Sequence, residues 1–255
     1  MIRLDRARVG ILATWSTHVQ MAFPSLTAFL EKAEAFERLD IDDPIRRAGF
    51  KAYAPEVLPS RGRRGDRDFR AIWGRAKRAI AAMSHRKCAY CETPLTAERT
   101  AVVEHFRPKS LFPSLVYDWA NYFLGCGGCN GAKWNRWPEG GVCYVRPDED
   151  DPAMLFLFRE DGRMEPLDLG GSAEITIQDL DLNRKWLVRR RALRIRETLA
   201  ELTNVLDEEE IPEEAKFRLV RRALDRLQNP ELEYLAAVRQ CFERALRERS
   251  HEKLP

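Results

Sequence analysis

The sequence predicts an α+β chain that is mainly helical, with a small irregular centre between helical flanks. Apolar residues recur at helical spacing near both ends of the 255-residue chain. In the middle, Pro94, Pro108 and Pro113 exclude a long helix before Tyr117. The same stretch holds two Cys-x-x-Cys pairs, a pattern typical of metal-bound folds. We therefore expect three regions, which are 1–84, 85–172 and 173–255.

Helices separated by a loop are expected in the N-terminal region. Ser25 is a favourable cap for a helix over residues 26–38, whose apolar residues share one face. Residues 50–65 contain proline, glycine and arginine and predict a basic loop. Asp66 is a favourable cap for a further helix that ends near Met83, with arginines on its polar face.

Short strands and one helix are expected in the centre. β-branched residues favour extended structure around Thr100–Phe106. A helix is expected to begin near Asn130 and to end before Trp137. Farther on, Met154–Phe158 predicts a strand, and residues 160–163 predict the turn of a hairpin.

The C-terminal region, residues 174–248, shows the periodicity of three helices. Asn229 followed by Pro230 predicts a break and a restart, with asparagine as the cap and proline at the first helical position. Together these elements predict helices, then a small strand-bearing centre, then a helical tail.

Bulk properties narrow the class of protein. Net charge is +3, but ten basic residues lie between Arg61 and Lys87, and a second basic cluster spans 184–196. Uneven charge of this kind is compatible with a polyanionic partner, and equally with solvated helix faces. The sequence has neither an apolar run long enough for a transmembrane helix nor a secretory signal pattern, so we expect a cytoplasmic protein.

The cysteine spacing predicts a structural zinc site. A Cys-x-x-Cys turn directs two thiolates to one side of a loop, and two such turns complete a tetrahedron. Unrelated cysteines or a redox pair are the alternative interpretations. Four thiolates leave no open position for water, so this metal would be structural. Cys143 and Cys241 have no such partner and are expected to be buried. The predicted ligands are Cys88, Cys91, Cys126 and Cys129.

A second group of residues predicts catalysis. Glu104 and Asn130 supply oxygen ligands suited to Mg²⁺ or Mn²⁺. His105 is a candidate general base near neutral pH, and an amide such as that of Asn121 could fix its tautomer. The alternative interpretation of His105 is a packing histidine.

The order of these residues resembles the HNH nucleases, specifically the zinc-stapled type with a ββα-metal centre. The finer resemblance is to the HNH nuclease subunit of Septu antiphage and retron-associated systems, and it covers about residues 85–190. The segments that carry it are Cys88-Ala-Tyr-Cys-Glu92, Glu104-His-Phe-Arg-Pro-Lys109, Tyr117-Asp-Trp-Ala-Asn121, Cys129-Asn130 with Lys133, and Ile175-Thr-Ile with Leu180-Asp-Leu-Asn-Arg184.

The resemblance implies a metal-dependent endonuclease in antiphage defence, acting on DNA and controlled by a partner ATPase subunit (PtuA-like). His105 would activate water, Glu104 and Asn130 would hold one divalent metal, and Asn121 would orient His105. The family name implies histidine where Glu104 and Asn130 stand. Both substitutes occur in zinc-stapled members of the family, so we expect activity, with a stricter metal requirement. Flanking phosphates would be held by Arg107, Lys109 and Lys133.

Two other functions fit parts of the sequence. A non-catalytic zinc module that binds nucleic acid or protein would need the cysteines alone. An RNA nuclease, acting for example on tRNA, could use the same centre, since nothing in the sequence reads a base. Trp119, Trp134 and Trp137 could stack on bases, but we expect them to pack around the zinc site. The arginines of 184–196 are expected to face solvent or a partner.

Overall fold

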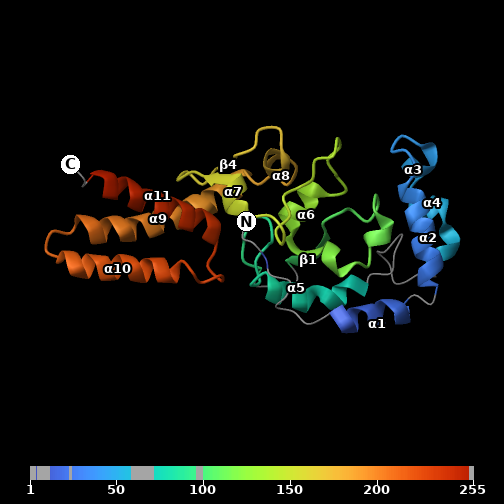
Figure 1. The fold of residues 1–255 in the computed structure, drawn as a ribbon, viewed down its shortest axis with the longest axis horizontal. Coiled ribbons are helices and arrows are strands. Elements are labelled where there is room, and N and C mark those ends of the chain that lie inside the picture. The colour runs from blue at the N-terminus through green and yellow to red at the C-terminus, as the bar shows by residue number, and fades with distance from the viewer. Residues whose placement is uncertain (1–3, 5–11, 23–24, 59–71, 96–99, 253–255) are drawn as a thin grey trace.

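A computed structural model describes residues 4, 12–22, 25–58, 72–95 and 100–252. The predicted class is confirmed, because helices dominate and the strands are few and short. Figure 1 shows an elongated molecule, with helices at both ends and the strands between them. Buried apolar residues from all three parts form one continuous cluster. Among the described residues, no helix is both long and apolar enough to cross a membrane.

The N-terminal elements are short and surround aromatic side chains. Phe29 and Phe36 of α2 pack edge-on against Phe50. Within the described residues, Ser25 makes no capping hydrogen bond with its side chain, so it precedes the predicted helix without capping it. The elements are α1 (Leu12–Ala22), α2 (Leu26–Glu37), α3 (Pro44–Ala48), α4 (Phe50–Tyr53), a 3₁₀ turn (Pro55–Val57), a second 3₁₀ turn (Ile72–Ala76) and α5 (Lys77–Met83).

Two expectations for this region change. The start of the predicted basic loop is helical, because α4 and a 3₁₀ turn occupy residues 50–57. The rest of that loop and the proposed cap Asp66 lie outside the described residues. The helix expected after Asp66 is seen as a 3₁₀ turn from Ile72 that continues as α5.

The centre contains two antiparallel strands followed directly by a helix. β1 (Ala101–His105) pairs with β2 (Tyr122–Cys126), and His105 lies opposite Tyr122 in the register. α6 (Gly127–Lys133) begins immediately after β2, three residues earlier than expected. Between the strands lie two 3₁₀ turns, Pro113–Leu115 and Trp119–Asn121. The chain therefore returns to the end of β1 as it enters β2.

A second hairpin joins the centre to the tail. The predicted strand begins as helix α7 (Pro152–Leu155) and becomes β3 (Phe156–Phe158), because Asp151 caps a helical turn at Ala153. β4 (Met164–Pro166) pairs with β3 around the predicted turn.

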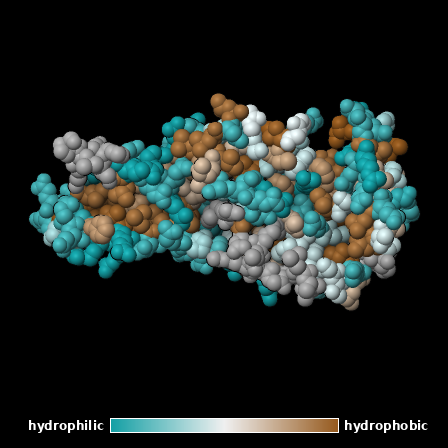
Figure 2. Space-filling model, in the orientation of Figure 1, coloured by the Kyte–Doolittle hydropathy of each residue, from teal (hydrophilic) through white to brown (hydrophobic). Residues whose placement is uncertain are grey.

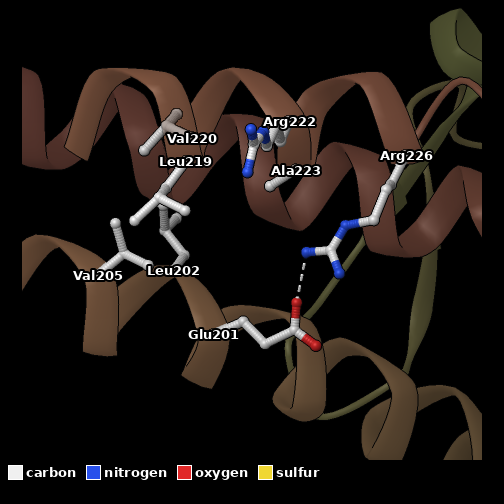
Figure 3. Close-up of a pocket in the computed structure, with 8 residues that line it drawn as sticks. All are labelled: Glu201, Leu202, Val205, Leu219, Val220, Arg222, Ala223 and Arg226. Carbon is white, nitrogen blue, oxygen red and sulfur yellow. Dashed lines mark hydrogen bonds and ion pairs between the residues drawn. The ribbon is translucent and has the colours of Figure 1, made fainter. Parts of the chain in front are cut away.

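The tail contains four helices rather than three: α8 (Ser172–Asp179), α9 (Lys185–Asp207), α10 (Glu213–Arg226) and α11 (Leu235–Glu252). The last of them starts later than Asn229 and Pro230 predict, since the intervening residues form turns. Helix α9 packs against both α10 and α11. Figure 2 shows hydrophobic side chains between α9 and α10. In Figure 3 the apolar side chains of Leu202 and Leu219 approach each other beside the Glu201–Arg226 ion pair.

Candidate active site

Four cysteine sulfurs come together at the base of the β1–β2 hairpin. All of their sulfurs lie within 4.8 Å of one another. The Sγ atoms of Cys91 and Cys126 are 3.7 Å apart. A tetrahedral site with Zn–S bonds of about 2.3 Å places its sulfurs about 3.8 Å apart, so this geometry fits a metal such as zinc. The four residues are Cys88, Cys91, Cys126 and Cys129.

Backbone hydrogen bonds fix the two cysteine turns against each other. The Ala89 amide donates to the Leu124 carbonyl at 2.8 Å, which ties the first turn to β2. Cys126 precedes α6, and its sulfur accepts the Cys129 amide at 3.3 Å. The cysteine cluster, as we call these four residues, therefore depends on both the strand and the start of the helix.

The remaining cysteines differ from each other. Cys241 is buried, as expected, but Cys143 is exposed. Cys143 lies two residues after Gly141, and its side chain lies outside the core.

Arg184 lies on the cysteine cluster. Its guanidinium is 3.5 Å from the Cys129 sulfur and 3.7 Å from those of Cys91 and Cys126. Burial alone would lower the pKa of Arg184, but the sulfurs of Cys129 and Cys91 outweigh it and raise that pKa. Gly128 permits this approach, because a Cβ there would lie 3.2 Å from the guanidinium. Arg184 therefore faces the four cysteine sulfurs, which corrects the expectation of solvent or a partner.

A separate pocket of about 420 Å³ lies at the other end of β1. It brings together Glu104, His105, Asn130 and Lys109, which the sequence singles out. None of the four cysteines lines it. Its full lining is Trp73, Val103, Glu104, His105, Pro108, Lys109, Ser110, Asn130, Trp134 and Asn135.

His105 is held by a backbone carbonyl and two aromatic rings. Its Nε2 lies 3.1 Å from the Val116 carbonyl oxygen, which can only accept. Nε2 therefore carries the hydrogen, and Nδ1 keeps its lone pair. Trp73 and Tyr122 pack edge-on against the ring, at 5.0 and 5.1 Å. Burial, with help from the charge of Lys109, lowers the pKa of His105 to about 3, so the imidazole is neutral at pH 7.

Glu104 is buried, and only one of its two carboxylate oxygens is paired. Its Oε1 pairs with the Lys133 amine at 2.6 Å, and both side chains are almost inaccessible. Its Oε2 makes no hydrogen bond among the described residues, although the nearby Tyr90 hydroxyl helps to stabilise the ionised carboxylate. Burial raises the pKa of Glu104, and Lys133 opposes that shift. Gly125 on β2 leaves room for the side chain, because a Cβ there would lie 3.2 Å from that of Glu104.

Burying a carboxylate oxygen without a partner costs desolvation free energy, and a bound divalent cation would offset that cost. Asn130 lines the same pocket and offers an amide oxygen. A carboxylate and an amide are hard oxygen ligands, and Mg²⁺ prefers such ligands. The chemistry of the lining therefore fits the predicted catalytic cation, which Glu104 and Asn130 would hold.

Asn121 supports the loop between the strands through hydrogen bonds to its backbone. Its Oδ1 accepts the Arg107 amide at 2.7 Å, and its Nδ2 donates to the carbonyls of Arg107 and Leu115 at 3.0 and 3.2 Å. Among the described residues, His105 is not one of its hydrogen-bond partners. The orienting bond predicted for Asn121 is instead made by the Val116 carbonyl.

The three basic residues predicted to hold phosphates lie in different surroundings. Lys109 lines the pocket, and its amine sits 4.3 Å from the centre of the Trp73 ring. Arg107 lies over the rings of Phe112 and Trp137 and lines a different pocket, beside Asn121. The amine of Lys133 is buried against Glu104 and donates to the His105 carbonyl, so its place is inside the protein.

The tryptophans separate into two kinds. Trp119 is buried and Trp137 packs among aromatic rings, so the expected core packing is confirmed for both. Within the described residues their ring partners are aromatic side chains such as Tyr122 and Tyr144, and packing around the zinc site stays a prediction. Trp134 is 75% exposed and lines the pocket, so the packing expected for it is wrong. Sequence reasoning also missed Trp73, which contacts His105 from a distant segment. No local pattern marks Trp73, but Trp134 follows Lys133 directly at the end of the motif.

Two curated proteins are similar to this chain. Septu protein PtuB of Bacillus thuringiensis is 44% identical over 117 residues, which are 44% of this chain and 44% of that protein. Septu protein PtuB of Bacillus mycoides (strain KBAB4) is 27% identical over 160 residues, which are 51% of this chain and 54% of that protein. The chain thus spans about half the length of the curated relatives it matches.

No protein-family description matches the chain. No solved structure matches it either. The likeness is therefore one of sequence, and over about half of its length the chain resembles the Septu PtuB proteins.

Proposed function

We propose that this chain is a metal-dependent HNH endonuclease that hydrolyses phosphodiester bonds of DNA in a Septu-type antiphage system. The observation that carries the proposal is the pocket in which neutral His105 lies beside Glu104 and Asn130. Similarity to proteins named Septu protein PtuB supports the setting. We propose the same three regions as the sequence predicts, with 85–172 as the nuclease core and 173–255 as the surface for an ATPase partner.

The tautomer and the fixed orientation of His105 suit a general base. Its Nε2–H donates to Val116, so its Nδ1 can take a proton from water. The low pKa of about 3 keeps this nitrogen unprotonated throughout the neutral range. The two aromatic edges restrict rotation of the ring, so the proton acceptor keeps one direction.

Charge in the pocket suits a phosphodiester. Bound to Glu104 and Asn130, a divalent cation would polarise the scissile phosphate and stabilise the leaving oxygen. Lys109 lines the same pocket and can offer its charge to an adjacent phosphate. Lys133 favours the ionised form of Glu104 and fixes the position of its carboxylate, and it also anchors the end of β1 through the His105 carbonyl.

The test is nicking of supercoiled plasmid DNA in Mg²⁺ or Mn²⁺, with the chain expressed alone and with its proposed ATPase partner. We expect His105→Ala to lower the rate about 10²- to 10⁴-fold, as loss of a general base does. His18→Ala, which changes an exposed histidine on α1, is the matched control and should leave the rate unchanged. Equal nicking by wild type and His105→Ala would overturn the proposed mechanism.

A further inference from the structure

Trp134 occupies a backbone position that favours glycine. The Lys133 carbonyl accepts the Arg136 amide at 2.9 Å, which closes a four-residue turn at the end of α6. Trp134 is the second residue of that turn, with φ 50° and ψ −120°. These angles are those of a type II′ turn, in which this position is dominated by glycine. A bulky side chain is therefore strained here.

Packing does not compensate for that strain. The side chain of Trp134 is 75% exposed, so most of its indole surface stays in water. In the described part of the chain it makes no ring contact with another aromatic residue. Neither backbone preference nor burial accounts for tryptophan at this position. A residue disfavoured on both grounds points to a function outside the folded core.

The indole lies at the edge of the candidate active site. Trp134 lines the pocket together with His105 and Asn130. Its backbone amide donates to the Asn130 carbonyl at 2.8 Å, so its position is tied to that of a proposed metal holder. The other tryptophan of the pocket, Trp73, is engaged by His105 on its edge and by the Lys109 amine over its ring.

We propose that Trp134 stacks on an unpaired DNA base next to the phosphate that is cut. This inference rests on the proposed nuclease function and names the substrate class of the same pocket. Every base has a π face, so stacking on an indole tolerates any sequence but requires the base to leave the duplex. The pocket would therefore select single-stranded DNA, or a duplex with an unpaired nucleotide, over a perfect duplex.

Binding is measured in the His105→Ala background, where DNA stays intact. Fluorescence anisotropy in Mg²⁺ gives Kd for one labelled sequence in three forms: single strand, perfect duplex, and duplex with one unpaired nucleotide. Trp134→Gly is expected to weaken binding of the two forms with an unpaired base about 5- to 150-fold, the range for loss of one stacked base. Binding of the perfect duplex should change little.

Two controls separate stacking from folding. Trp134→Gly should melt at the same temperature as the parent or higher, because glycine adopts the turn without strain. Trp186→Ala removes another exposed tryptophan, 51% accessible on α9, and should leave all three Kd values unchanged. Trp134→Phe should retain most of the binding, since phenylalanine also stacks.

Unchanged single-strand binding in Trp134→Gly would overturn the proposal, as would absence of single-strand binding in the His105→Ala parent. An equal loss on the perfect duplex would replace base stacking with insertion into a groove. These outcomes are independent of the nuclease test: His105-dependent nicking with unchanged Trp134→Gly binding leaves the function standing and removes only this inference.

Discussion

The cysteine cluster and the candidate active site share the β1–β2–α6 segment, yet they are built in opposite ways. The cluster is closed: four sulfurs face one another within 4.8 Å, and Arg184 covers them. The pocket is open: it has a volume of about 420 Å³, and one buried oxygen of Glu104 has no hydrogen-bond partner among the described residues. A closed set of ligands holds structure, whereas an open one leaves room for substrate and water.

The contrast also explains how one short segment serves both centres. Cys126 and Cys129 fix the start of α6, and Asn130 follows directly on the same helix. Lys133, one turn farther, pairs with Glu104 across on β1. Metal binding at the cluster would therefore fix the position of α6, which forms one wall of the pocket. The two centres would use different ligands, but the geometry of the pocket would depend on the cluster.

Loss of a cluster ligand should have the largest effect. Structural zinc contributes about 10–16 kcal/mol to folding in small zinc domains, which is as large as the whole stability of a typical domain. We expect Cys129→Ala to lose bound metal and the cooperative melting of the centre. Mass spectrometry of metal content and thermal denaturation check this. Cys143→Ala, at an exposed cysteine, is the control; a folded, metal-loaded Cys129→Ala protein would refute the structural role.

Lys133→Met should have the next largest effect. It leaves the Glu104 carboxylate buried without its counter-charge, and breaking a buried pair in this way costs about 3–5 kcal/mol. Denaturant titration should show that loss, accompanied by reduced nicking. If Lys133 acted only as a phosphate contact, stability would be unchanged and binding alone would weaken, which contradicts the buried pair.

Asn121→Ala should lower stability by about 1 kcal/mol, because it removes hydrogen bonds to partly buried backbone groups of Arg107 and Leu115. Denaturant titration gives the magnitude. Asn121→Asp keeps the acceptor for the Arg107 amide but cannot donate, so it should be destabilised as well. A variant with unchanged stability and lost nicking would instead make Asn121 a direct participant in the reaction.

Arg184→Met should have the smallest effect, confined to metal affinity. The guanidinium donates to sulfurs of the cluster, and loss of such outer partners typically weakens metal binding about 10- to 100-fold. Competition with a zinc-binding dye measures this. Arg189→Met, at an exposed position on α9, the helix that begins directly after Arg184, is the matched control. Equal zinc affinity in both variants would show that the arginine contributes nothing to the cluster.

Local spacing predicted more of the site than of its surroundings. Cys-x-x-Cys turns are local, so the sequence could indicate the cluster, and neighbouring positions on β1 and α6 could indicate Glu104, His105 and Asn130. Arg184 lies 55 residues beyond Cys129, and only tertiary packing brings it to the sulfurs. The burial of Lys133 likewise depends on how α6 packs across β1.

Helix periodicity predicted the mainly helical tail but miscounted its elements. Residues 172–179 form α8, a short helix whose polar and apolar residues do not separate clearly onto two faces. Its helical periodicity is therefore weak in the sequence. The sequence predicts a core position for Trp134, because tryptophan side chains are on average highly buried. Its exposure follows from the turn that ends α6, which the sequence does not mark with the usual glycine.

The most direct test of two centres with separate tasks is one metal-exchange experiment on the wild-type protein, with its proposed partner present. Brief dialysis against EDTA is followed by measurement of zinc content and of plasmid nicking before and after Mg²⁺ is restored. We expect zinc to remain in the closed cluster, nicking to disappear, and Mg²⁺ alone to restore it. Nicking that follows zinc content and does not recover with Mg²⁺ would contradict the separation of the two centres.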